Sequence, residues 1–299
     1  MAERKAVLIY NPNAGRGTDP ARAVEAFCAG ARAGGVEVEV RPTAGPNDAA
    51  RLAAEAAASG ATDIVARGGD GTVHEAIQGM VGAGARLLVW PAGTANVLAR
   101  QLELPRGAAE AAEVLARGRA RRITLGAGTS ERTGERRYFF MMAGVGLDAS
   151  VVRSVRPRLK RRLGEAAFWY AGLAHLAHWV PREFTVEVGG ERLRATYAAV
   201  GKAPWYGGKL AVTPRARLDA DEFEVCVIDT HSRMRYLRLL GYAMRGGAPE
   251  EGARGLTFRR AARLRCEGAG VYVQADGELI GELPMTFEVV PEGLELIIP

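Results

Sequence analysis

The chain has few cysteines, and they lie far apart. Among its 299 residues only Cys28, Cys226 and Cys266 are cysteines, and none belongs to a CxxC motif. A disulfide framework needs an even set of cysteines, and a thiolate metal site needs paired motifs. The sequence therefore argues against both kinds of fold and fits a reducing cytoplasm.

A long apolar run is also missing. The longest weakly charged segment, residues 166–180, contains His175 and His178 and is shorter than the roughly 20 residues that a membrane-spanning helix needs. The first residues lead directly into the apolar run 6–10, without the pattern of a signal peptide. We expect a soluble cytoplasmic protein that can still lie peripherally at the inner face of the membrane.

Lysine is scarce, because only four of the 40 basic residues are lysines. The formal net charge is nevertheless +6, and the 48% hydrophobic and 25% charged content is normal for a globular protein. A basic balance suits nucleic acid, an anionic membrane or phosphorylated ligands. The motifs below favour the last two, so we expect no nucleic-acid partner, and the sequence is compatible with a homodimer.

Residues 1–122 alternate short apolar runs with alanine-rich helical patterns. We expect strands at 6–10, 36–40, 63–66 and 86–90 and helices at 20–35, 47–60, 72–80 and 95–104. Alternation of this kind predicts an α/β domain with a mostly parallel sheet.

The pattern changes after residue 122. Residues 184–188 and 191–200 alternate apolar and polar side chains around a Gly189-Gly190 turn, which predicts a hairpin. Further strand-like runs lie at 223–228, 271–277, 285–290 and 294–298, and one helical insert lies near 164–179. We therefore expect a second domain, 123–299, that is an antiparallel β-sandwich, with its last residues able to pack back on the first domain.

The first predicted strand is followed by NPNAGRG, residues 11–17. Asn11 and Pro12 favour a turn, the glycines permit positive φ, and Arg16 offers a fork of donors to phosphate oxygens. A plain turn with an exposed arginine explains the motif equally well.

The third predicted strand is followed by GGDGT, residues 68–72. Gly68, Gly69 and Gly71 let a ligand approach the backbone, and the first amides of the next helix are free donors that attract anions. Thr72 and Glu75 also match a capping box, so these two residues could serve the helix alone.

Asp70 is unexpected in a loop that suits a phosphate. A carboxylate about 4 Å from a phosphate is repelled by roughly 1 to 4 kcal/mol. The placement becomes reasonable if a divalent cation lies between the two anions, and Mg²⁺ commonly bridges carboxylates and substrate phosphates. Asp70 therefore predicts a metal–phosphate site.

The fourth predicted strand is followed by PAGTANVLAR, residues 91–100. Gly93 permits close approach, and Thr94 and Asn96 supply hydrogen bonds at a helix start, although Thr94 could simply cap that helix. A second such loop beside GGDGT predicts a shared nucleotide crevice at the carboxyl ends of the strands. The sequence contains neither GxxxxGK[ST] nor GxGxxG, so the nucleotide is held differently from P-loop and dinucleotide-binding proteins.

Two further segments carry chemistry. QADGELIGE, residues 274–282, places Asp276 and Glu278 beside a glycine; a phosphoryl-transfer enzyme needs a base near the acceptor hydroxyl, but a solvated turn explains the pair as well. Residues 153–164 carry six cations and precede an aromatic helix. They suit docking on an anionic membrane, or a solvated loop beside a core helix.

Together these motifs, with GVGLDASVV at 144–152 and the segment 207–225, resemble the diacylglycerol kinase catalytic family, which includes sphingosine kinases and bacterial lipid kinases. The resemblance covers nearly the whole chain. It implies an NAD-kinase-like α/β domain, a β-rich acceptor domain, and an ATP-dependent kinase of lipid metabolism that uses Mg²⁺ and a lipid substrate. It places nucleotide and phosphate contacts on Asn11, Arg16, Thr43, Gly68, Gly69, Asp70, Gly71, Thr72, Glu75, Gly93, Thr94 and Asn96.

The resemblance also implies two roles in the second domain. Glu278 becomes the general base, acting with Asp70 in catalysis, and a structural cation lies near Leu218, Asp221 and Phe223, the first and last contributing backbone oxygens. Two alternatives remain. An NAD kinase shares GGDGT, and a weakly catalytic lipid- or nucleotide-binding regulator is compatible with Val97 and Asp221-Glu222, where many relatives have Asp and Asp-Gly.

Overall fold

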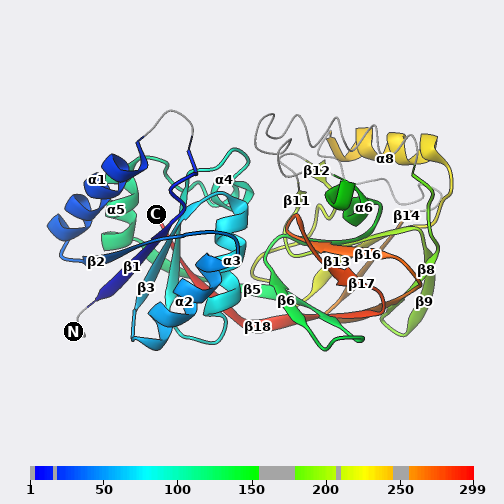
Figure 1. The fold of residues 1–299 in the computed structure, drawn as a ribbon. Helices are drawn as coiled ribbons and strands as arrows, with labels where there is room; N and C mark the ends of the chain where they lie inside the picture. The colour runs from blue at the N-terminus through cyan, green and yellow to red at the C-terminus, as the bar shows by residue number, and fades with distance from the viewer. Residues whose placement is uncertain (1–3, 16–18, 155–178, 207–209, 245–255) are drawn as a thin grey trace. The chain divides into compact units, whose positions relative to one another are not determined.

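The structure is a computed structural model that describes residues 4–15, 19–154, 179–206, 210–244 and 256–299 (Figure 1). The chain divides into two compact units, residues 1–123 with 292–299, and residues 124–291. All three cysteines are free. Among the helices in the described ranges, none has the length and apolar character that crossing a bilayer requires.

The first unit is a parallel α/β structure. Its strands follow the order β2-β1-β3-β4, and the end of β18 continues the sheet next to β4, with Leu296 opposite Leu87. The elements are β1 (Lys5–Tyr10), α1 (Pro20–Ala33), β2 (Glu37–Pro42), α2 (Asp48–Ala58), β3 (Asp63–Gly68), α3 (Asp70–Met80), β4 (Arg86–Pro91), α4 (Val97–Gln101) and α5 (Ala108–Arg117).

The central strands β1, β3 and β4 are continuous apolar runs, so both faces of the sheet are buried. Leu8, Val65 and Trp90 pack with α1 and α5 in one core cluster, whereas α2 and α3 pack together over β1 and β3 (Figure 1). This confirms the predicted α/β fold. Helix α3 starts two residues earlier than predicted, α4 is shorter than 95–104, and the sequence analysis did not single out α5.

The second unit is an antiparallel β-sandwich. One sheet has the order β14-β13-β10-β7-β16-β17, and the other has β18-β15-β8-β9, with β5 pairing β18 and β6. The remaining elements are β5 (Arg119–Ser130), β6 (Arg136–Phe139), β7 (Met142–Gly146), α6 (Leu147–Ser154), β8 (Phe184–Val188), β9 (Glu191–Ala195), β10 (Tyr197–Gly201), β11 (Trp205–Tyr206), β12 (Leu210–Ala211), β13 (Phe223–Ile228), α8 (Arg233–Met244), β14 (Leu256–Ala261), β15 (Arg263–Glu267), β16 (Tyr272–Ala275), β17 (Glu278–Glu282) and β18 (Met285–Ile298).

Alternation along the strands builds the sandwich core. In β8 the side chains of Phe184, Val186 and Val188 are buried against residues of the facing sheet, while Thr185 and Glu187 point outward. The predicted β-rich second domain is thus confirmed, as is the hairpin at Gly189-Gly190, where β8 pairs with β9.

Three features of the second unit differ from the predicted elements. The predicted strand 191–200 is broken at Thr196, because β9 pairs in one sheet and β10 in the other. The runs 285–290 and 294–298 form one strand, β18, and helix α8 was not predicted. The predicted insert at 164–179 lies outside the described residues except for Trp179.

The α2–α3 contact depends on Gly79, and this can be tested. A Cβ atom at Gly79 would lie 2.1 Å from the carbonyl oxygen of Ala50 and 2.9 Å from the nitrogen of Ala54. We expect Gly79→Ala to lower the free energy of unfolding by about 1 to 3 kcal/mol, because overpacking outweighs a gain in helix propensity.

Gly241 in α8 is the matched control, because no atom lies within 4 Å of its added Cβ. Gly241→Ala should raise the free energy of unfolding by up to about 1 kcal/mol. Urea unfolding measures both values. A Gly79→Ala variant as stable as the wild type would contradict the close packing of α2 on α3.

Candidate functional site

The loops that follow β1, β2 and β3 are joined at the carboxyl edge of the first sheet. The Asn11 N–H donates to the carbonyl oxygen of Arg67 at 3.0 Å, and the Thr43 N–H donates to that of Tyr10 at 2.9 Å. The chain passes from β1 to β2 on one side of β1 and then crosses to β3 on the other side of β1. This makes the β1/β3 boundary a topological switch point. The predicted residues Asn11, Thr43 and Gly68 therefore meet at the edge where such sheets bind ligands.

The GGDGT and PAGTAN loops pack directly on each other. The carbonyl oxygen of Gly68 accepts the N–H groups of Ala92 at 2.8 Å and Gly93 at 3.2 Å. A Cβ atom on Gly93 would lie 2.5 Å from the Cα atom of Gly69. Asn96 closes its own loop, since its amide nitrogen donates to the Gly93 carbonyl oxygen at 2.6 Å. Glycine is thus required where the two loops touch.

Asp70 has a structural partner that the sequence argument did not foresee. It is the first residue of α3, and its Oδ1 atom accepts the backbone N–H of Val97, the first residue of α4, at 2.8 Å. The carboxylate thus serves as an N-terminal cap for a helix elsewhere in the chain. A carboxylate accepts several bonds at once, so this contact orients Asp70 without excluding a cation.

The capping roles considered for Thr72, Glu75 and Thr94 are wrong. Helix α3 begins before Thr72, after Gly69, and has no side-chain cap, whereas α4 begins after Asn96. The Oε2 atom of Glu75 instead accepts the N–H of Ala49 at 3.3 Å, in the first turn of α2.

The remaining predicted residues occupy the same loops. Thr72 is buried below Gly68, Gly71 lies in the first turn of α3, and Thr94 is exposed. Arg16 lies outside the described residues. Nucleotide contacts by all of these residues stay predictions.

Arg67 was not among the residues predicted from the sequence. This residue is 3% exposed, its guanidinium lies 4.8 Å from the centroid of the Trp90 ring, and burial lowers the pKa of Arg67. Within the described part of the chain, its Nε and Nη1 atoms have no hydrogen-bond partner. An arginine that ends an apolar strand just before a glycine loop was the available signal, because a buried cation needs a reason to be there.

Glu278 is presented by a tight hairpin in the second unit. Asp276 and Gly277 have φ values of 49° and 87° and connect β16 to β17, as in a type I′ turn. The Asp276 carboxylate accepts the backbone N–H groups of residues 140–142 at 2.8 to 3.0 Å. This anchor fixes the turn, and Glu278, the residue that follows the turn, is exposed at the surface.

The structural cation expected near Leu218, Asp221 and Phe223 does not fit the residues found there. The Leu218 carbonyl oxygen already accepts the N–H of Thr124 at 2.8 Å, and the buried Lys202 places its ammonium in the same turn. A divalent ion about 4 Å from that ammonium would be repelled by about 8 kcal/mol at an effective dielectric constant of 20. We therefore assign no metal role to these residues.

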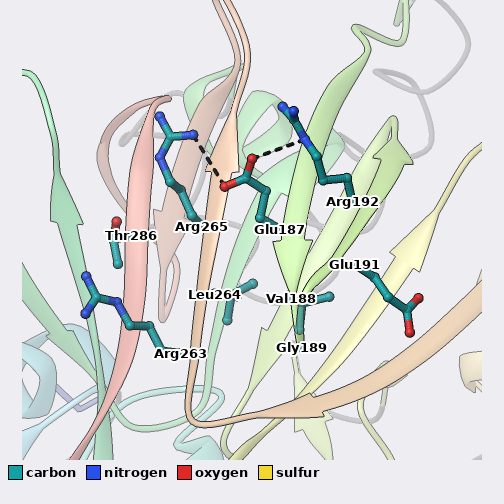
Figure 2. Close-up of a pocket in the computed structure, with 10 residues that line it drawn as sticks. Glu187, Val188, Gly189, Glu191, Arg192, Arg263, Leu264, Arg265 and Thr286 are labelled. Carbon is teal, nitrogen blue, oxygen red and sulfur yellow. Dashed lines mark ion pairs between the residues drawn. The ribbon is translucent and has the colours of Figure 1, made fainter.

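A groove of about 410 Å³ lies on the second unit but holds none of the predicted site residues (Figure 2). Arg192 and Arg265 flank Glu187, with nitrogen–oxygen distances of 3.2 and 3.6 Å. Ion pairs of this kind at a surface are common and contribute little. The groove is therefore not the candidate site.

Comparison with known proteins agrees with this geometry. Residues 5–127 match the diacylglycerol kinase catalytic domain, and residues 141–298 match the YegS C-terminal NAD kinase beta sandwich-like domain. The chain is 30% identical to a diacylglycerol kinase of Mycobacterium tuberculosis, covering 99% of this chain and 95% of that protein. It is 33% identical to a Pseudomonas aeruginosa protein named "Probable lipid kinase YegS-like", covering 92% and 89%.

The fold is shared as well. The crystal structure of a diacylglycerol kinase from Bacillus anthracis str. Sterne superposes with a TM-score of 0.76 at 19% identity, covering 100% of this chain and 98% of that one. The matches to both halves and the full-length relatives lead to one conclusion. The chain belongs to the diacylglycerol kinase catalytic-domain family and is a kinase.

Proposed function

We propose that this kinase transfers the γ-phosphate of ATP to a hydroxyl group of a lipid. One observation carries the proposal: the glycine loops after β3 and β4 pack on each other and hold a fixed carboxylate, Asp70, at the ligand-binding edge of the sheet. The names of the relatives point to the same class of acceptor.

The first unit supplies the nucleotide contacts. The backbone N–H groups at the start of a helix suit phosphate oxygens, and α3 starts at this edge, with Asn11, Thr43, Gly93 and Thr94 on the adjoining loops. Asp70 fits a Mg²⁺ ion bound with the nucleotide, because its carboxylate is held in place by Val97 and only half buried. When bound, Mg²⁺ neutralises charge that develops on the transferred phosphate.

Glu278 of the second unit supplies the base. Its carboxylate takes the proton of the lipid hydroxyl while that oxygen bonds to the γ-phosphorus and the bond from phosphorus to the bridging oxygen breaks, releasing ADP. Asp276 positions the base, because three backbone N–H bonds fix the turn that precedes it.

The direct test is transfer of label from [γ-³²P]ATP to a total bacterial lipid extract, with the product identified by mass. Diacylglycerol, a sphingoid base, phosphatidylglycerol and a polyketide-like alcohol each offer a hydroxyl on an apolar tail. Label on NAD supplied as acceptor would instead reveal an NAD kinase. Lipid binding without any transfer would identify a regulator.

The two roles of Asp70, hydrogen bonding to Val97 and supplying a negative charge, can be tested separately. Asp70→Asn keeps an oxygen for the Val97 N–H and removes the charge, whereas Asp70→Ala removes both. We expect Asp70→Ala to lower the free energy of unfolding by about 1 kcal/mol and Asp70→Asn to change it little. Both should lower kcat by roughly 100-fold or more, since several kcal/mol of charge stabilisation is lost.

Thermal melts and the transfer assay measure these effects. Full activity of Asp70→Asn at ordinary Mg²⁺ concentrations would confine Asp70 to its capping role.

Glu278→Gln should lower kcat by roughly 10² to 10⁴, because the amide cannot accept the proton. ATP affinity, measured by calorimetry, should stay unchanged. The matched control is Glu282→Gln, the same substitution four residues further along β17, which should retain activity. Near-normal turnover of Glu278→Gln would remove this residue from the role of base.

Membrane contact is the second part of the proposal, because the lipid acceptor lies in a bilayer. Of the predicted basic segment, Arg158, Lys160, Arg161 and Arg162 lie outside the described residues. Helix α8 supports the idea from another part of the chain.

Helix α8 is anchored on one side and exposes both apolar and basic side chains on the other. Its first half contains three arginines and one tyrosine, namely Arg233, Arg235, Arg238 and Tyr236. The helix contains no acidic residue. Tyr236 is buried, and its hydroxyl lies 2.7 Å from the Thr196 hydroxyl. The other side exposes apolar side chains, as helices at a membrane interface do. They are Met234, Leu237 and Met244, exposed by 62%, 40% and 59%.

Replacing Met234, Leu237 and Met244 together with Ser should weaken binding to phosphatidylglycerol vesicles by about tenfold or more, because apolar area no longer enters the bilayer. Sedimentation with these vesicles measures the affinity. Val40→Ser is the control, since Val40 is exposed by 38% in β2 of the first unit. Unchanged binding of the triple variant would exclude α8 as the docking face.

A further inference from the structure

The turn between β12 and β13 is built around a buried ammonium group. Lys202, the residue after β10, has no exposed surface, and its Nζ atom donates to the carbonyl oxygens of Ala220 and Glu222. We infer that the Lys202 ammonium stands in this turn where a bound cation would otherwise be needed, so that the second unit folds without a structural metal ion.

The carbonyl oxygens of this turn converge as they do around a hard cation. Three of them, on Leu218, Ala220 and Glu222, have a donor from the chain itself. The Leu218 oxygen accepts the N–H of Thr124 at 2.8 Å, and the Ala220 oxygen lies 2.7 Å from the Thr124 hydroxyl as well as next to Lys202. An ammonium offers three donors, enough to serve several carbonyls from one position.

The charges around Lys202 suit an internal cation. Burial lowers the pKa of Lys202 to about 8, while the nearby carboxylates of Asp221, Asp219 and Glu222 act in the opposite direction. The amine is therefore still mostly protonated at neutral pH. Acidic side chains beside converging carbonyls are the surroundings of a cation site, and here the cation is covalently part of the chain.

The same lysine is linked to the turn that carries the proposed base. The backbone N–H of Lys202 donates to the carbonyl oxygen of Met141 at 2.8 Å, and the N–H of Met141 donates to Asp276 at 3.0 Å. Asp276 begins the turn that leads to Glu278. The backbone next to the buried ammonium therefore pairs with the segment on which Asp276 is anchored.

The first test uses the full-length wild-type protein without nucleotide. Thermal melts in EDTA, in 5 mM Mg²⁺ and in 5 mM Ca²⁺ should agree within about 1 °C, because an ion bound only to the folded protein would raise the midpoint. Native mass spectrometry should find no stoichiometric divalent ion. A midpoint that falls in EDTA and recovers with either ion would overturn the inference, provided that Asp70→Asn shows the same response.

The second test replaces the ammonium. Lys202→Met should lower the midpoint by about 5 to 10 °C, because the Ala220 and Glu222 carbonyl oxygens each lose a charged donor. Lys5→Met is the control, since Lys5 is an exposed lysine at the start of β1, and it should shift the midpoint by less than about 2 °C. A Lys202→Met midpoint equal to the wild type would overturn the inference, and if this variant does not fold, the wild-type melts decide alone.

These outcomes are separate from those of the proposed function. A chain that transfers no phosphate to any lipid can still melt independently of divalent ions. A chain that transfers phosphate only with Mg²⁺ can do so through the nucleotide, while the nucleotide-free protein remains insensitive to EDTA.

Discussion

The contact between two glycine loops is the constraint on which the first unit depends. The Gly68 carbonyl oxygen accepts two N–H groups of the neighbouring loop, and a side chain at Gly93 would collide with the backbone of Gly69. Because the loops touch, Asp70 at the start of one helix reaches Val97 at the start of another. A carboxylate that would be mobile in an open loop is thereby held at a defined place.

The second unit uses buried or anchored charges in a similar way. The Asp276 carboxylate accepts three backbone N–H groups, and the Lys202 ammonium donates to two carbonyl oxygens. Hydrogen bonds to an ionised group are stronger than neutral ones. Each of these two side chains therefore fixes an irregular segment that the regular pairing of the sheets does not reach.

Short-range patterns in the sequence were sufficient to predict several strands and the loops that follow them. Apolar runs followed by glycine, asparagine or proline located β1, β3 and β4 and the loops at their ends, alternation located β8 and β9, and a short strand-like run located β13. Asn11, Gly68 and Gly93 could be selected because a parallel sheet brings the ends of its strands together.

Such patterns could not predict contacts between residues that are far apart in the sequence. Asp70 and Val97 are 27 positions apart, and Glu75 and Ala49 are 26 apart. The break at Thr196 depends on which sheet each strand joins, and the cation expected near Leu218 does not fit because Lys202, the residue after β10, places its ammonium in that turn. Helix α8 was missed because its arginines obscure an apolar pattern that is partly exposed.

Arg67 has a consequence for the behaviour of the ligand-free protein. A guanidinium enclosed beside Trp90, with two nitrogen atoms unmatched among the described residues, leaves the sheet edge electrostatically unsatisfied. The enclosed guanidinium has lost water without gaining a full set of acceptors among the described residues. This edge of the sheet is therefore less stable than its apolar packing alone would make it.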